Sequence, residues 1–495
     1  MGIIIRQGFW GLSLVYVGVA LGYISTLLVL PAFLDVEEIG LLRLIQSNGL
    51  MLAPLAAFGI PTTWLQISPK YSQDLKLRSQ AFCLSLLSLL ITNGLLLFAV
   101  FIYADNIKWY FEAKSSLYNN YLLISAFIFI SQSFYETFAA VSQSYFKATL
   151  PVYFKEIHLR LTTLILVILY GYEYIELDFT LYCIGFNYIL TSLILGVLII
   201  VKNKLIPRWP KKFLNSFHLR SFFGLSSYFG LLAIGGSIIQ YSGQLITASE
   251  LGLEQNGILT TCVFIAAVIE MPRRVINQVS TPLITSYLET NNIEDLSNLN
   301  KKASLNMFLI TGLIFLVIGF CLTDLFNTIP KGDTFNQGFY VVLLIGLGKT
   351  IGMTFGMDTE IFMYSNLKKW NILILGLSSI FMLTANFIFI DHYGIIGAAI
   401  AMTSTFLLTH LIRTFLIWRR FKISPFDVNQ IKLLIPISIT IGLMLLLALN
   451  FHPYLNILLK TFIISVIFLG ICISLKISEE INNLYKKAIA LIGLR

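Results

Sequence analysis

The chain has 495 residues, of which 57% are apolar and only 12% are charged. A water-exposed surface needs roughly a quarter of its residues charged, so this composition excludes a soluble globular protein and predicts an integral membrane protein. The formal net charge of +9 would suggest a nucleic-acid partner in a soluble protein. Here the basic residues lie in short stretches beside apolar segments, which is typical of membrane topology, and no nucleic-acid partner is expected.

Long apolar segments follow one another along the whole chain. A membrane-spanning helix needs about 20 apolar residues, and fourteen segments qualify: 9–34, 40–67, 80–104, 117–144, 151–174, 179–201, 221–249, 256–286, 303–327, 337–364, 370–390, 393–417, 431–450 and 455–476. The fifth is the least apolar, because it contains Lys155, Glu156, His158 and Arg160. The segments are continuously apolar and do not alternate, which favours helices over barrel strands. The sequence therefore predicts an all-α integral membrane protein with about 14 transmembrane helices.

The signs of the charges alternate in step with these predicted spans. Of the 34 Lys and Arg residues, 28 lie at the chain ends or in every second connection, whereas three lie in the connections between those. The intervening connections are acidic or neutral, as at Glu37 and Glu38. Because cytoplasmic loops carry the excess of Lys and Arg, we expect both termini in the cytosol.

One long polar connection divides the chain. Residues 202–220 contain Pro207 and Pro210 and separate six spans from eight. The predicted domains are an N-terminal lobe of six helices (1–201), a basic cytoplasmic linker (202–220), a C-terminal lobe of six helices (221–417), and two last helices with a cytoplasmic tail (418–495).

A short self-match supports two pseudo-repeated lobes. Gly40 follows Glu37 and Glu38 at the start of the second span, and Gly257 follows Glu254 at the start of the eighth. Transporters built from such repeats place their substrate site at the repeat interface. The match predicts two six-helix bundles of this kind.

Lys349 lies deep inside the tenth span. A charge at a helix centre costs about 2.5–3.5 kcal/mol on insertion scales, and Lys349 is about 15 Å into the span at a rise of 1.5 Å per residue. Two interpretations stay open: Lys349 snorkels or pairs with a carboxylate elsewhere in the bundle, or it lines a polar cavity. The run Gly346 to Thr350 resembles the end of a P-loop, but position 343 is Leu and no strand precedes it, so nucleotide binding is rejected.

A second group of charges lies in the eighth span. Glu270, Arg273 and Arg274 are spaced i, i+3 and i+4 and so share one helix face, and Pro272 frees a backbone carbonyl between them. They form either a self-neutralising cluster at the inner interface, or a pair between Glu270 and one Arg that leaves the other Arg for an anionic ligand, since guanidinium binds phosphate oxygens in bidentate fashion.

Four further charges lie nearer the ends of spans. Arg43 is one turn inside the second span, Glu136 lies in the inner part of the fourth, and Asp358 and Glu360 lie in that of the tenth. Arg43, Asp358 and Glu360 also fit interfacial anchoring, whereas Glu136 is a candidate for proton or cation coupling. Lys460, in the last span, is assigned no role.

Signatures of catalysis or metal binding do not occur in the sequence. The five cysteines each fall in an apolar segment, without a CxxC pair or a His at ligand spacing, and the five histidines are scattered. The sequence contains no HExxH, GxSxG or DxD motif. We therefore predict no catalytic residue, no metal and no cofactor, and a protein that is not an enzyme.

The chain resembles the polysaccharide and O-antigen (Wzx-type) flippase family of the multidrug/oligosaccharidyl-lipid/polysaccharide (MOP) exporter superfamily. The resemblance rests on the 6 + 6 + 2 arrangement, on Gly11-Leu12-Ser13, on the run from Glu37 to Leu41, and on the segment from Leu50 to Tyr71 with its Pro54, Gly59 and Pro61. It implies two six-helix lobes around a cationic cavity, which move an undecaprenyl-diphosphate-linked oligosaccharide across the bacterial inner membrane by alternating access. Such a repeat unit would build O-antigen, as in lipopolysaccharide, or another surface polysaccharide.

The residues that would serve this function come from the local analysis. Arg43, Arg273, Arg274 and Lys349 are expected to contact the substrate headgroup, with Glu270 orienting them and Glu136 as a weaker candidate for coupling. The expected partners are the lipid-linked oligosaccharide and membrane lipids, with a polysaccharide polymerase and a chain-length regulator as candidates.

Three alternatives stay open at this point. A multidrug and toxin exporter of the same superfamily typically has twelve spans and buried acidic residues for cationic substrates. A lipid II flippase shares fourteen spans and a cationic cavity. A membrane-embedded polysaccharide polymerase or ligase usually carries a large external loop, and the outer connections here are short.

Overall fold

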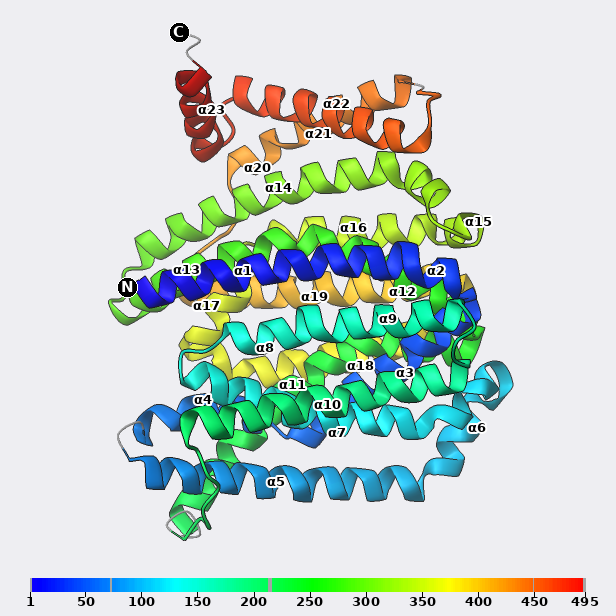
Figure 1. Cartoon of the computed structure of the whole chain (residues 1–495). Coiled ribbons are helices and arrows are strands. Elements are labelled where there is room, and N and C mark those ends of the chain that lie inside the picture. The colour runs from blue at the N-terminus through cyan, green and yellow to red at the C-terminus, as the bar shows by residue number, and fades with distance from the viewer. Residues whose placement is uncertain (1, 72–73, 212–215, 448, 493–495) are drawn as a thin grey trace. The chain divides into compact units, whose positions relative to one another are not determined.

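The computed structural model describes residues 2–71, 74–211, 216–447 and 449–492 (Figure 1). Every element in these residues is helical, which confirms the predicted all-α class. Residues 212–215 of the predicted linker and 493–495 of the predicted tail lie outside the described residues. The long apolar helices make the chain a multi-pass membrane protein.

The chain divides into two compact units. The first comprises Met1–Thr260 and Leu375–Ala398, and the second comprises Thr261–Ile374 and Ala399–Arg495. The lobe boundaries predicted at 201, 220 and 417 stay a prediction.

The first unit is built on three long packed helices. Helix α7 (Leu122–Ser144) packs against both α3 (Val36–Ala57) and α10 (Leu177–Asn203). Trp64 and Phe82 are fully buried against each other in the core of this unit. The unit also contains α1 (Gly2–Tyr23), α2 (Leu30–Phe33), α4 (Ile60–Ile67), α5 (Leu75–Ile102), α6 (Ala104–Ser115), α8 (Thr149–Tyr153), α9 (Leu159–Gly171), α11 (Ser216–Leu251), and most of α18 (Trp370–Tyr393).

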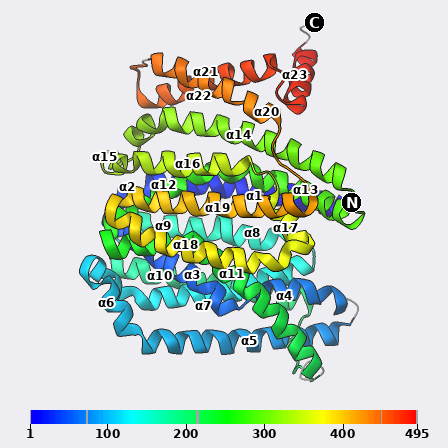
Figure 2. The same ribbon diagram turned by 180° about the vertical axis from the view of Figure 1, so that it is seen from behind.

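The second unit is organised around α14 (Ile293–Thr328). This helix packs against α13 (Met271–Glu289), α16 (Phe339–Met353) and α22 (Pro453–Ser474), and the views from both sides show it running beside α16 and α22 (Figures 1 and 2). The other helices are α15 (Gly332–Phe335), α17 (Asp358–Tyr364), most of α19 (Ile395–Phe421), α20 (Val428–Lys432), α21 (Leu434–Leu446) and α23 (Glu479–Ile492).

The number of spans differs from the predicted fourteen. Twelve helices of the described chain are long and apolar enough to cross a membrane, or thirteen if one bent pair counts as a span. The bent pair is Gly332–Met353 with Asp358–Tyr364, which meet at 54°. The remaining predicted span, 151–174, is helical from Thr149 to Gly171, but Lys155, Glu156 and Arg160 make it too polar to count. The stretch before the fourth span, predicted as an acidic connection, forms helix α6.

The two glycines of the sequence self-match lie against each other. A methyl group on Gly40 would lie 1.8 Å from the carbonyl oxygen of Leu253, and one on Gly257 would lie 2.4 Å from that of Val36. The side-chain amide of Asn256 donates to the carbonyl of Gly40 at 2.9 Å. Glycine at both positions therefore allows the backbones of α3 and α12 (Leu253–Ala267) to cross in contact.

Candidate functional site

Two helix breaks in the second unit carry most of the predicted site residues. Between α12 and α13 the chain passes through a short 3₁₀ turn, Val268–Glu270, and Pro272 lies in the first turn of α13. Between α16 and α17 the helix is interrupted at 354–357, where Gly356 has a φ of +66° that L side chains rarely adopt. Broken helices supply free backbone groups and polar side chains at membrane depth, where transporters commonly bind their substrates.

A charge pair joins the first break to helix α16. The Lys349 ammonium donates to Glu270 Oε2 at 3.0 Å. The Lys349 side chain is 17% exposed and that of Glu270 is 39% exposed, so the pair lies at an open edge of the unit. Lys349 thus pairs with a carboxylate, as the first interpretation expects, and its place in the lining of a polar cavity stays a prediction.

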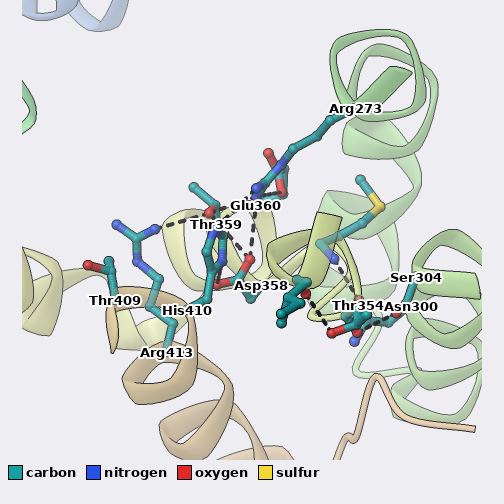
Figure 3. Close-up of polar contacts among 12 residues, drawn as sticks. Arg273, Asn300, Ser304, Thr354, Asp358, Thr359, Glu360, Thr409, His410 and Arg413 are labelled. Carbon is teal, nitrogen blue, oxygen red and sulfur yellow. Dashed lines mark hydrogen bonds and ion pairs between the residues drawn. The ribbon is translucent and has the colours of Figure 1, made fainter. Parts of the chain in front are cut away.

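A buried network, which we call the Arg273 network, lies one helical turn further on. It consists of Arg273, Asp358, Glu360, His410 and Arg413, whose side chains converge in Figure 3. Arg273 lies 3.4 Å from Asp358 and 3.8 Å from Glu360. His410 Nδ1 lies 2.8 Å from the other oxygen of Asp358. Arg413 donates to Thr359 and Asn371, each at 3.1 Å.

The structure changes the predicted pairing in the eighth span. Glu270 was expected to pair with Arg273 or Arg274, but it accepts from Lys349 instead, and Arg273 turns to Asp358 and Glu360. The carboxylates on α17 belong to a different span, so their distance from Arg273 was not contained in the local spacing. Arg274 is exposed and remains a cation at the surface of the second unit.

A second group of charges, the Arg43 cluster, lies in the first unit. It consists of Arg43, Glu136, Lys155, Glu156 and Arg160. Arg43 donates to the neutral oxygens of Thr26 and Gln46 at 2.8 and 3.1 Å. Arg160 pairs with Glu156 at 2.7 Å and donates to the carbonyl of Gly18.

The Arg43 cluster continues to Glu136. Lys155 lies 3.1 Å from Glu136, which also accepts from Gln132 at 2.7 Å. The phenol of Tyr188 interacts electrostatically with Arg43, Lys155 and Arg160, and that of Tyr241 interacts with Glu136, so these groups surround one polar region. Three cations face two carboxylates in this cluster, and Arg43 is the cation whose hydrogen-bond partners are neutral.

Sequence analysis missed several of these residues. Lys155 and Arg160 only marked the fifth predicted span as the least apolar. Arg413 was not singled out, but its side chain is buried. Asp358 fitted interfacial anchoring, whereas its carboxylate is almost fully buried. One signal was present: His410 and Arg413 are three residues apart on one face of a predicted span, as are Glu156 and Arg160 at four residues apart.

Lys460, to which no role was assigned, has a partner as well. Its ammonium lies 2.6 Å from Asp324 on α14, and Asn456 donates to the same carboxylate at 3.0 Å. These contacts join α22 to α14, which is a packing role.

The described residues contain no group of three or more His, Cys, Asp or Glu side chains arranged to hold a metal ion. The two clusters present hydrogen-bonding and charged side chains. Their guanidinium groups can bind anions, and their imidazole and carboxyl groups can exchange protons.

The sequence matches no protein-family model and no curated protein. Solved structures do match. A lipid II flippase MurJ in an inward closed conformation has a TM-score of 0.67 at 14% identity, covering 89% of this chain and 96% of that one. An inward-facing multidrug resistance MATE family transporter of the MOP superfamily has a TM-score of 0.64 at 12% identity, covering 84% and 98%. A MOP superfamily transporter from Pyrococcus furiosus has a TM-score of 0.50 at 12% identity, covering 85% and 93%. The chain therefore has the fold of the MOP-superfamily transporters.

Proposed function

We propose that this protein is a transporter that flips an undecaprenyl-diphosphate-linked oligosaccharide, the repeat unit of an O-antigen or another surface polysaccharide, across the bacterial inner membrane by alternating access. Both termini are proposed to be cytoplasmic. A diphosphate with attached sugars cannot cross hydrocarbon unaided, so its headgroup needs a shielded polar path while the polyprenyl tail stays in lipid. A polysaccharide polymerase and a chain-length regulator are the candidate partners for the flipped product.

The observation that carries this proposal is the charge balance around Arg43. Its guanidinium donates only to neutral oxygens in the described contacts, at Thr26 and Gln46, and Arg160 lies nearby. An unneutralised guanidinium at membrane depth is costly unless it serves an anionic ligand, and its fork of donors matches phosphate oxygens. We propose Arg43 as the main headgroup contact in the first unit, with Arg274 and Lys349 as contacts in the second.

The same charges argue against a cationic substrate. The carboxylates of Glu136, Glu156, Glu270 and Asp358 each have a cation within 3.4 Å, namely Lys155, Arg160, Lys349 and Arg273. A multidrug exporter that binds cations needs a carboxylate that is available to the drug. We therefore rank the multidrug exporter below the flippase, and nothing in the described geometry favours a polymerase or ligase.

A lipid II flippase is the second candidate, because a lipid II flippase is among the solved structures with this fold. Both candidates would move a polyprenyl diphosphate, and they differ in the attached sugars. The test must therefore compare two glycans.

The experiment deletes the gene in its native bacterium and measures surface polysaccharide together with undecaprenyl-diphosphate-linked oligosaccharide on each leaflet of the inner membrane. We expect surface polysaccharide to be lost and unpolymerised repeat units to remain on the cytoplasmic leaflet. A defect in cell-wall synthesis with normal surface glycan would identify the lipid II flippase instead. Unchanged glycan with increased sensitivity to cationic drugs would contradict the proposal and promote the exporter.

Complementation then tests Arg43. Arg43→Gln should lower flipping about tenfold or more, because a charge-assisted hydrogen bond contributes about 1.5–3 kcal/mol and 1.4 kcal/mol corresponds to a factor of ten. Arg208→Gln, which removes an exposed cation from the connection after α10, is the control and should complement fully. Equal complementation by both variants would remove Arg43 from the substrate site.

A further inference from the structure

The imidazole of His410 lies between a carboxylate and a guanidinium, all three nearly inaccessible to solvent. Side-chain exposure is 4% for His410, 1% for Asp358 and 9% for Arg273. The three come from different helices of the second unit, α19, α17 and α13, and meet in Figure 3. A histidine and an aspartate in contact at membrane depth form the kind of pair that carries protons in transport proteins.

The hydrogen-bond partners of His410 indicate which tautomer its neutral ring adopts. Its Nδ1 lies 2.8 Å from Asp358 Oδ2, and its Nε2 lies 3.4 Å from Arg273 Nη1. A guanidinium can only donate, so Nε2 must accept with its lone pair, and the hydrogen of the neutral ring lies on Nδ1 and is donated to the carboxylate. A hydrogen on Nε2 would instead point at the N–H groups of Arg273.

A second proton on His410 is therefore incompatible with the present position of Arg273. It would bind the Nε2 lone pair, turn the acceptor into a donor, and put two cations 3.4 Å apart. The imidazolium would then neutralise Asp358 in place of the guanidinium. The proton and Arg273 thus compete for the same carboxylate.

A second carboxylate, that of Glu360, lies near the Arg273 guanidinium and can accept it when it leaves Asp358. Glu360 Oε2 lies 3.8 Å from its Nη2, and this buried oxygen accepts no hydrogen bond from the described residues. A small rotation of the guanidinium would convert this long contact into a direct one. Glu360 also accepts from Asn277, so its carboxylate is already held in position.

The other groups around His410 are consistent with an exchange of one proton. Phe355 stacks on the ring at 5.7 Å and Phe406 packs edge-on at 4.5 Å, which separates the pair from water on those sides. The charged groups facing it are Asp358 and Glu360 on α17, Arg273 on α13 and Arg413 on its own helix, and Arg413 is held by Thr359 and Asn371. Two cations and two anions cancel in the present state, so one added proton changes the net charge of the network from zero to +1.

We propose that His410 is a proton-binding site, and that its protonation moves Arg273 from Asp358 to Glu360. Arg273 lies in the first turn of α13, three residues after the Glu270 that pairs with Lys349. Protonation of His410 would thereby change the contacts between α13 and α17. The further step, that this proton drives transport, rests on the proposed function.

The protonation of His410 can be measured without any transport assay. The full-length protein, labelled with ¹⁵N-histidine and placed in lipid nanodiscs, contains five histidines, and His410→Gln identifies the signal of interest. Near neutral pH we expect the neutral ring with its hydrogen on Nδ1, and on acidification a ring with hydrogen on both nitrogens. A ring with its single hydrogen on Nε2 would overturn the proposal from the wild-type spectrum alone.

Variants test the competition with Arg273. Arg273→Gln removes the cation facing Nε2, so His410 should bind its proton at least tenfold more tightly, whereas Arg273→Lys should stay close to wild type. Arg274→Gln, at the adjacent exposed arginine, is the matched control and should leave the His410 titration unchanged. An unchanged titration in Arg273→Gln protein that melts normally would show that the proton and Arg273 do not compete.

Transport is then assayed in proteoliposomes with an inside-to-outside pH difference and a polyprenyl-diphosphate-linked sugar as substrate. Wild-type flipping should depend on the pH difference, and His410→Gln should abolish that dependence. A wild-type flipping rate that does not depend on the pH difference would contradict the coupling of transport to protons. A wild-type protein that flips no such lipid would contradict the proposed function, while the NMR titration would still decide the proton site.

Discussion

The Arg43 cluster of the first unit and the Arg273 network of the second unit hold charge at membrane depth in different ways. In the Arg43 cluster, Glu136 and Lys155 are 43% and 53% exposed, and three cations face two carboxylates. In the Arg273 network, Asp358 is 1% exposed and two cations face two carboxylates. An open, positively charged cluster can accept an anionic ligand, whereas a closed, neutral network can hold together helices and respond to a single proton. Differences in burial and charge balance therefore separate a candidate binding surface from a candidate switch.

The largest effect should come from breaking the closed network. Asp358→Ala leaves Arg273 buried without this carboxylate and His410 without its hydrogen-bond partner, and removal of one partner from a buried ion pair costs about 3–5 kcal/mol. Thermal unfolding in detergent should show this destabilisation as a large decrease in the unfolding temperature. The control is Glu136→Ala in the open cluster. Equal losses for the two variants would mean that burial does not distinguish the clusters.

Breaking the pair of Glu270 and Lys349 should have an intermediate effect on stability. Lys349→Met leaves Glu270 without its partner. Because Glu270 is partly exposed, we expect the free energy of unfolding to fall by about 2 kcal/mol. The double variant Lys349→Met with Glu270→Met removes both charges and should recover most of that loss, since apolar replacement of a whole ion pair is often neutral. A double variant that is less stable than Lys349→Met would show that the two residues act on stability independently.

The smallest effect is expected in the open cluster. Glu136→Gln removes an exposed charge pair, and such pairs contribute about 0.2–1 kcal/mol. The difference in the free energy of unfolding between Glu136→Gln and wild type should be smaller still in 1 M salt, where the screening length falls to about 3 Å. A loss above 2 kcal/mol that persists in high salt would place Glu136 in a closed environment and remove the contrast between the units.

Much of the fold followed from local patterns in the sequence. The apolar segments predicted an all-helical membrane protein, because a chain in hydrocarbon must satisfy its own backbone hydrogen bonds. Of the fourteen predicted spans, twelve match a helix that is long and apolar enough to cross a membrane, and a thirteenth matches the bent pair. The two segments outside these twelve, 151–174 and 337–364, are helical as well, but the first contains several charged residues and the second bends near a positive-φ glycine. The self-match of Gly40 and Gly257 predicted a repeat, which remains a prediction, and the close helix crossing at these two residues appeared only in three dimensions.

Most of the charged residues of the candidate sites could be predicted from the sequence, but their interaction partners could not. Arg43, Glu136, Glu270, Arg273, Arg274 and Lys349 were identified because charge inside a span is costly, and that cost can be estimated from sequence position alone. Several of their partners come from other helices, such as Asp358, which is 85 positions from Arg273, and His410, which is 137 positions from it. His410 and Arg413 were missed for this reason, since a histidine in an apolar helix has no meaning until its neighbours are known.

The sequence by itself determined the class of the protein, the approximate positions of its helices and the charges that need an explanation, because hydropathy and insertion cost depend on short stretches of chain. Only the tertiary structure decided which of these charges neutralise one another. That choice depends on distances between helices, and a Coulomb interaction of a few ångströms in a low-dielectric interior is sensitive to each of them. Packing therefore left Arg43 with neutral partners, paired Lys349 with Glu270, and enclosed His410 between Asp358 and Arg273.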